Sequence, residues 1–150
     1  QAGLSWSIVL AKRAEYKKAF RDFDIEYCLQ LSDEELEKIR QDYNVIKNSA
    51  KIKAVSSNAA AVIQLKKDFG SFSDFLWSYV DFKPVVNSWE TEGQMPAQSD
   101  LSEQISKDLK KRGFKFVGPV IIYSFLQAIG MVDDHIKTCP QHTANRQTVK

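Results

Sequence analysis

The chain has 150 residues, 43% hydrophobic and 11% aromatic, so it can bury one core and is not a disordered polymer. Its net charge of +2 excludes a strongly basic nucleic-acid protein, so any such surface must arise from local clustering. Two cysteines are too few for a secreted disulfide framework, and the longest apolar run is far short of the roughly 20 residues that span a bilayer, so we expect a soluble, cytoplasmic protein.

Helical signals dominate the first half of the chain. Apolar residues at helical spacing predict an amphipathic helix from about Ser5 to Arg21. Ser32 and Glu35 have the spacing of a capping box and predict a short helix that ends near Tyr43. The longest helix is expected from Ser49 to a C-cap at Gly70.

The second half continues in the same class. A short helix should follow Ser73, and the stretch from Lys83 to Gln98, with its prolines and glycine, is predicted to be a surface loop. One helix should end with cations just before Gly113, and another should run from about Pro119 to Gly130. We find no alternating strand pattern, so the predicted fold class is all-α.

A basic hairpin is the most informative segment. The stretch Lys110 to Ser124, KKRGFKFVGPVIIYS, joins two helices through a tight turn containing Gly118 and Pro119, flanked by four basic residues. Glycine lets backbone N–H groups approach an anion, and the next helix N-terminus adds its positive dipole end, so one phosphate could bind there. An ordinary helical hairpin with a solvated basic face remains the alternative, which the residue types alone favour.

This segment also resembles the signature of the 3-methyladenine DNA glycosylase I family, a branch of the helix-hairpin-helix glycosylases. QAGLSW at 1–6 matches the family's pocket-entry loop. The similarity extends over essentially the whole chain, including FLWSYV at 75–80 and the segment 130–139. The resemblance therefore implies a helix-hairpin-helix DNA glycosylase-like helical domain over residues 1–139, with a flexible C-terminal tail over 140–150.

The resemblance implies a base-excision repair function. Such an enzyme flips 3-methyladenine out of alkylated double-stranded DNA and hydrolyses its N-glycosidic bond. We expect a monomer that does not contact membranes. The family's pocket glutamate and base-contacting tyrosine belong to a segment just before Gln1, so no catalytic residue is named here, and we expect native sequence to precede Gln1.

Two departures from the wider superfamily are visible. Phe116 stands where most helix-hairpin-helix hairpins have their first glycine, while Gly118 keeps the second. No aspartate lies about twenty residues beyond the hairpin, where most relatives carry a catalytic one, and Asp133 and Asp134 are too close. The family is known for lacking that aspartate, so the absence agrees with the resemblance.

Trp6 is the predicted base-binding residue. In the family the matching tryptophan stacks on the extruded base, and a cationic base over an indole gains about 0.5 to 2 kcal/mol. By residue type alone Trp6 would be a core aromatic. Leu4 resembles an apolar wedge that fills the space left by the flipped nucleotide, or else a hydrophobic staple. The predicted DNA contacts are Gln1, Gly3, Leu4, Lys115, Gly118, Pro119 and Ser124.

A structural zinc site is also implied. The family holds zinc with a histidine and a cysteine that match His135 and Cys139, and the other two ligands should lie upstream of Gln1. By spacing alone, a surface histidine and a free thiol are the favoured alternative. His142 is a possible third ligand, and Cys28 is more typical of a buried small hydrophobe.

Other functions remain open at this stage. Lys47 and Lys51 are candidates for a basic helix start that faces DNA, with solvated lysines as the alternative. A non-catalytic helix-hairpin-helix DNA-binding module is the alternative to an enzyme. A helix-turn-helix regulator is disfavoured, because the helix over 120–129 is almost wholly apolar and lacks polar base-reading side chains.

Overall fold

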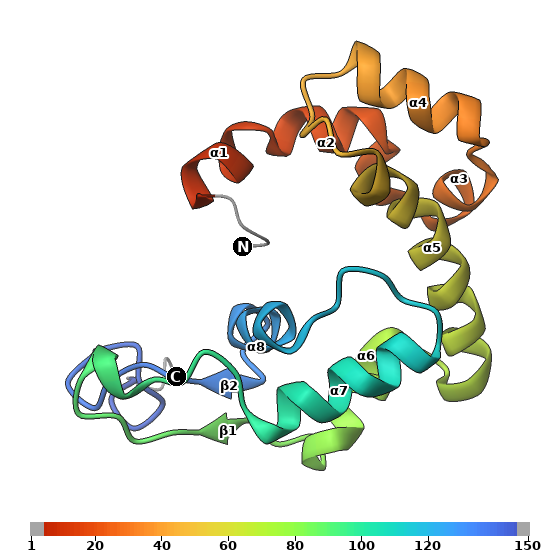
Figure 1. Cartoon of the computed structure of the whole chain (residues 1–150). Helices are drawn as coiled ribbons and strands as arrows, with labels where there is room; N and C mark the ends of the chain where they lie inside the picture. Colours follow the sequence, from red (N-terminus) through yellow and green to blue (C-terminus); the bar gives the residue numbers. More distant parts are fainter. Residues whose placement is uncertain (1–4, 147–150) are drawn as a thin grey trace. The chain divides into compact units, whose positions relative to one another are not determined.

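The computed structural model describes residues 5–146, with the side chain of Trp6 left outside the described part (Figure 1). Its contacts group the chain into two compact units, where we predicted a single helical domain over 1–139. The first unit comprises Gln1–Phe72 and Leu109–Val117. The second comprises Ser73–Asp108 and Gly118–Lys150.

The first unit is built from helices. In chain order its helical elements are α1 (Trp6–Ala11), α2 (Arg13–Ala19), the 3₁₀ turn η1 (Arg21–Phe23), α3 (Ile25–Gln30), α4 (Asp33–Asp42) and α5 (Ser49–Phe69). The helix predicted from Ser5 to Arg21 therefore exists but is divided at Lys12, whose ammonium donates to the Asn44 carbonyl oxygen at 3.0 Å. Helix α3 was not predicted. It is only six residues long, and its start signal is a single aspartate, Asp24, whose carboxylate accepts from the Tyr27 N–H at 2.7 Å.

The predicted helix ends of α4 and α5 are confirmed. The Ser32 hydroxyl accepts from the Glu35 N–H at 3.2 Å, and the Glu35 carboxylate accepts from the Ser32 N–H at 2.8 Å, which closes the capping box. Gly70 caps α5 with a φ of 83°, in the left-handed region that favours glycine.

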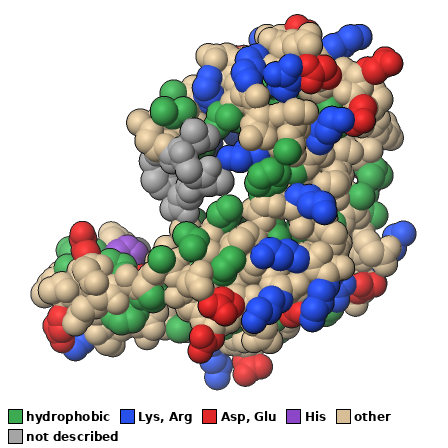
Figure 2. Space-filling view, in the orientation of Figure 1, with side chains coloured by type: hydrophobic (Ala, Val, Ile, Leu, Met, Phe, Trp, Pro, Cys, Tyr) green, Lys and Arg blue, Asp and Glu red, His purple; other side chains and the backbone are tan. Residues whose placement is uncertain are grey.

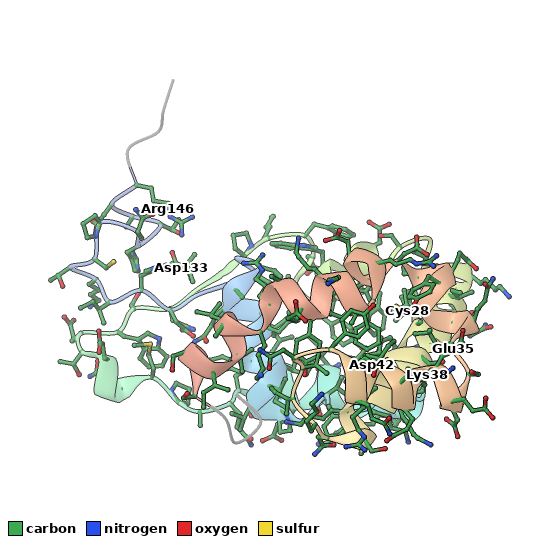
Figure 3. The ribbon with its side chains drawn as sticks, turned by 90° about the horizontal axis from the view of Figure 1, so that it is seen from above. Cys28, Glu35, Lys38, Asp42, Asp133 and Arg146 are labelled. Atoms are coloured by element: carbon green, nitrogen blue, oxygen red, sulfur yellow. The ribbon has the colours of Figure 1, made fainter. Side chains whose placement is uncertain are left out.

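The core of the first unit packs α2, α3 and α4 against α5. Its buried residues are Ala19, Phe20, Cys28, Leu31, Leu36, Ile39, Val45, Ile52 and Ala59. Cys28 is 2% exposed and lies among these helices (Figure 3), and burial raises the pKa of its thiol. The interpretation of Cys28 as a buried small hydrophobe is confirmed.

The second unit adds a minimal sheet to its helices. The elements of this half of the chain are α6 (Phe72–Trp77), η2 (Ser78–Val80), β1 (Val85–Val86), η3 (Glu92–Gln94), α7 (Asp100–Lys111), α8 (Pro119–Ala128) and β2 (Val132–Asp133). Strands β1 and β2 pair in parallel, with Val85 opposite Val132 and Val86 opposite Asp133. The all-α class is confirmed, but the loop predicted over 83–98 contains β1, because a two-residue strand is too short to show alternation.

The C-terminal segment makes several contacts up to residue 146, and His142 is its buried residue. His142 is 5% exposed, and the Thr143 N–H donates to the buried Asp133 carboxylate at 2.7 Å. Arg146 lies 3.8 Å from the same carboxylate (Figure 3). The flexible tail predicted over 140–150 stays a prediction. No helix among residues 5–146 is long and apolar enough to cross a membrane.

Candidate functional site

The first arm of the basic hairpin, residues 112–117, lies on α5 within the first unit (Figure 1). The Asn58 side chain bonds both backbone groups of Lys115: its Oδ1 accepts from the Lys115 N–H at 2.8 Å, and its Nδ2 donates to the Lys115 carbonyl at 3.2 Å. This single amide fixes the backbone of the arm while the Lys115 side chain stays exposed. Sequence reasoning missed Asn58, because nothing near it in the chain indicates its partner.

The base of the arm is held by Arg112. Its guanidinium lies 2.7 Å from the Asp68 carboxylate and 4.7 Å from the centre of the Phe69 ring. Phe114 is buried, and its ring centre lies 5.9 Å from that of Phe72. Of the four basic residues that flank the hairpin turn, Arg112 thus has an anchoring role in the fold.

Phe116 has an unusual conformation at the tip of this arm. Its φ is 58°, in the left-handed region where a β-carbon is strained, and its side chain is 45% exposed. The Lys51 ammonium lies 5.8 Å from the centre of its ring. The departure noted in the sequence therefore places an exposed aromatic at a position whose backbone favours glycine.

Gly118, in contrast to Phe116, has a backbone conformation that does not require glycine. It is the N-cap of α8 with a φ of −61° and a ψ of 155°, an extended conformation open to any residue, and a β-carbon there would meet nothing within 4 Å. Neither its backbone nor its packing explains the glycine. The space beside Gly118 at the start of α8 is open.

Two further residues of the hairpin segment, Pro119 and Ser124, lie within α8. Pro119 is the first residue of α8, where its missing N–H costs nothing. The Ser124 hydroxyl donates to the Val120 carbonyl at 3.2 Å, which leaves its lone pairs as acceptors. The described geometry does not test the predicted DNA contact of Ser124.

Most of the predicted pocket-entry residues lie outside the part of the chain that the structure describes. Gln1, Gly3 and Leu4 fall outside the described residues, and so does the side chain of Trp6, although α1 begins at Trp6. Their predicted roles stay predictions.

Lys47 makes hydrogen bonds at the end of α4. Its ammonium donates to the carbonyl oxygens of Arg40, Gln41 and Tyr43, which end α4, with distances of 2.9 Å to Gln41 and 2.7 Å to Tyr43. A cation at the last carbonyls of a helix stabilises that end. The Lys47 side chain is exposed, in agreement with the alternative of a solvated lysine, and its DNA-facing role stays a prediction.

The predicted metal ligands lie in the second unit. The His135 Nδ1 lies 2.7 Å from the Asp133 carboxylate, which orients the imidazole and directs its Nε2 away from that contact. A carboxylate behind a histidine in this way is the usual support of a metal-binding imidazole. Cys139 is a free, half-buried thiol. His135 thus fits a zinc ligand, although no group of three or more potential ligands is found among the described residues.

His142 does not fit as a third ligand. The Ala144 N–H donates to its Nδ1 at 3.1 Å, so Nδ1 is the acceptor and Nε2 carries the hydrogen that reaches the Asn87 carbonyl at 3.0 Å. Both ring nitrogens are engaged within a buried site. The suggestion of His142 as a third ligand is corrected by these contacts.

Asp133 and Asp134 are buried structural carboxylates. Burial raises the pKa of each, but hydrogen bonds outweigh it and hold both below the ordinary value: Thr143 and His135 donate to Asp133, and four neutral donors serve Asp134. The donors to Asp134 are Asn87 at 2.6 Å, Trp89 at 2.7 Å, Gln127 at 2.6 Å and Tyr123. Both stay ionised at neutral pH, and their contribution to stability is lost only as the pH falls through the lowered pKa values.

The surface carries a mixture of charges, as the small net charge of +2 leads us to expect. On the face shown in Figure 2, lysine and arginine side chains alternate with acidic and hydrophobic ones. A DNA-binding surface therefore has to be argued from the hairpin and its neighbours, as above.

Comparison with known proteins assigns the chain to one family. Residues 1–142 match the model of the methyladenine glycosylase family. DNA-3-methyladenine glycosylase 1 of Escherichia coli (strain K12) is 42% identical over 146 residues, which cover 97% of this chain and 78% of that protein. DNA-3-methyladenine glycosylase of Haemophilus influenzae is 40% identical, covering 96% of this chain and 78% of that protein.

Solved structures agree. A crystal structure of 3-methyladenine DNA glycosylase I matches with a TM-score of 0.89 and 42% identity, covering 95% of this chain and 78% of that one. A structure of the Staphylococcus aureus 3-methyladenine DNA glycosylase I, which concerns 3-methyladenine recognition, matches with a TM-score of 0.90 and 39% identity over 95% of this chain and 76% of that one.

Proposed function

Because the chain belongs to the methyladenine glycosylase family, we propose that it is a DNA-3-methyladenine glycosylase of base-excision repair. The observation that carries the proposal is 42% identity over 97% of the chain to an enzyme of that name. The substrate is double-stranded DNA with alkylated bases, and the enzyme works in the cytoplasm as a monomer. It cuts the N-glycosidic bond of a base that has left the stack.

The reaction needs little acid catalysis. Methylation gives the adenine a positive charge, so the base takes the electron pair of the broken bond and leaves neutral. Water forms the new bond to the sugar carbon and releases its proton to solvent. The protein must therefore supply an unstacked, bound base and a fixed DNA backbone.

We assign these tasks to two segments. Trp6 stacks on the cationic base, and Leu4 fills the space it leaves. Gly118 and the first turn of α8 bind a backbone phosphate, and Lys115 adds a second contact by charge. The open space at Gly118 and the exposed Lys115 side chain support this assignment.

Release of free base tests the proposal directly. A protein that carries the segment upstream of Gln1 is incubated with methylated duplex DNA, and free 3-methyladenine is measured by chromatography, with unmethylated duplex as the control. Release only from methylated DNA supports the enzyme. Binding of damaged duplex without any release of base would instead support the alternative of a non-catalytic DNA-binding module.

Lys115→Ala should lower the salt dependence of DNA binding. Each phosphate contact of a cation contributes a slope of about one to the plot of log affinity against log salt, and the exposed Lys115 ammonium is one such contact. Titration of a fluorescent duplex at several salt concentrations measures the slope. An unchanged slope would make Lys115 a solvated lysine.

We also propose a structural zinc held by His135 and Cys139, with two ligands upstream of Gln1. His135→Ala and Cys139→Ala should each remove about one equivalent of zinc from a protein that carries the upstream segment. Each should also lower its unfolding temperature, because zinc binding is coupled to folding. The 150-residue chain should bind zinc weakly. Elemental analysis after dialysis against a mild chelator decides, and a metal-free longer protein contradicts the assignment.

A further inference from the structure

Phe116 is strained and exposed, and the fold does not account for its ring. Its φ of 58° suits glycine, and its side chain is 45% exposed. Phe23 has a similar φ of 61°, but its ring stacks on the buried Phe20 at 5.6 Å, so packing explains it. Phe116 thus presents an exposed ring on the hairpin, at a position whose backbone favours glycine.

The surroundings of Phe116 hold its ring in place. Asn58 bonds both backbone groups of Lys115, the residue before it, so the arm cannot relax freely. The Lys51 ammonium, from the first turn of α5, lies 5.8 Å from the ring centre. An apolar face and a positive charge are thus presented side by side by two segments of one unit.

An apolar ring beside an ammonium matches one unit of the DNA backbone. The C–H face of a deoxyribose can pack on an aromatic ring, and the adjoining phosphate can bind the ammonium. Paired bases inside a duplex are not accessible to the ring, whereas sugars and phosphates are, in every sequence.

We propose that Phe116 and Lys51 form a DNA-backbone contact of their own, in which the Phe116 ring packs on a deoxyribose and Lys51 binds the phosphate next to it. This proposal rests on the proposed function, since it needs DNA as the ligand. The proposed contact adds the start of α5 to the DNA-binding surface and assigns a function to the exposed Phe116 ring.

Phe116→Gly tests the proposal with a duplex that contains a stable abasic-site analogue, which requires binding but no catalysis. The variant should unfold at the wild-type temperature or higher, because glycine relieves the strain. Its dissociation constant should rise about tenfold for every DNA sequence. Phe116→Leu, which keeps the β-carbon but lacks the ring, should weaken binding similarly, and Lys51→Ala should lower the salt slope by about one.

Phe82→Gly is the matched control. Phe82 has the same φ of 58° and is 63% exposed, but it lies in the second unit and not in the hairpin. Its replacement should relieve the same strain and leave DNA affinity unchanged. Wild-type affinity of Phe116→Gly, or an equal loss in Phe82→Gly, would overturn the proposal. A wild-type protein that carries the upstream segment and binds this duplex, but releases no 3-methyladenine, would reject the glycosylase assignment and leave this contact standing.

Discussion

Trp6→Ala should lower the single-turnover release of 3-methyladenine by about tenfold to a thousandfold. Stacking of a base on an aromatic contributes about 1 to 3 kcal/mol, and the positive charge of the base adds about 0.5 to 2 kcal/mol over an indole face. Each 1.4 kcal/mol or so lost is tenfold in rate when the interaction is made on the way to the transition state. Loss of both terms would give about tenfold to several thousandfold, and the expected range covers most of that span.

Two further variants isolate the stacking role of Trp6. Trp6→Phe keeps a ring with a weaker attraction for cations, so its rate should fall between those of the wild type and Trp6→Ala. Ile8 lies on the same helix, α1, and is 47% exposed, so Ile8→Ala removes apolar surface there and should keep full activity. Full single-turnover activity of Trp6→Ala would place Trp6 in the core or at the periphery.

Gly118→Val should weaken DNA binding about tenfold to a hundredfold without destabilising the protein. The backbone at Gly118 is extended and its β-carbon has open space, so the fold should accept the side chain. A phosphate at the first turn of α8 would meet the new methyl groups and lose hydrogen bonds that contribute about 1.5 to 3 kcal/mol to a charged acceptor. Thermal unfolding and titration with duplexes of several sequences measure the two effects.

Gly93→Ala is the control for this variant. A β-carbon at Gly93 also meets nothing within 4 Å, and Gly93 lies in η3, away from the hairpin. It should change neither unfolding nor DNA affinity. Equal DNA affinity of Gly118→Val and wild type would show that no phosphate approaches this glycine, whereas a loss limited to one DNA sequence would indicate base reading.

The sequence by itself determined those features that depend on neighbours in the chain. The capping box of Ser32 and Glu35, the C-cap at Gly70 and the start of α8 at Pro119 were all predicted where the structure has them. Each involves contacts within a few residues, so the local pattern contains the whole cause. The strings of the hairpin likewise indicated the family that residues 1–142 match.

Only the tertiary structure decided the roles of side chains whose partners lie far away in sequence. Asn58 reaches Lys115 across 57 positions, and His142 reaches Asn87 across 55. Arg112 is drawn to Asp68 in the same way. Residue type and spacing cannot reveal such partners. A lysine, arginine or histidine gives the same sequence signal whether its side chain contacts solvent, a ligand or a buried acceptor.

The two hairpin residues illustrate this limit most clearly. Sequence reasoning attached the need for glycine to Gly118 and noted Phe116 only as a departure. The backbone shows that glycine is conformationally favoured at Phe116, where φ is 58°, and is not required at Gly118, where φ is −61°. The sign of φ at each position depends on how the arm packs on α5 and on where α8 begins. It is therefore a property of the folded structure that the sequence pattern does not reveal.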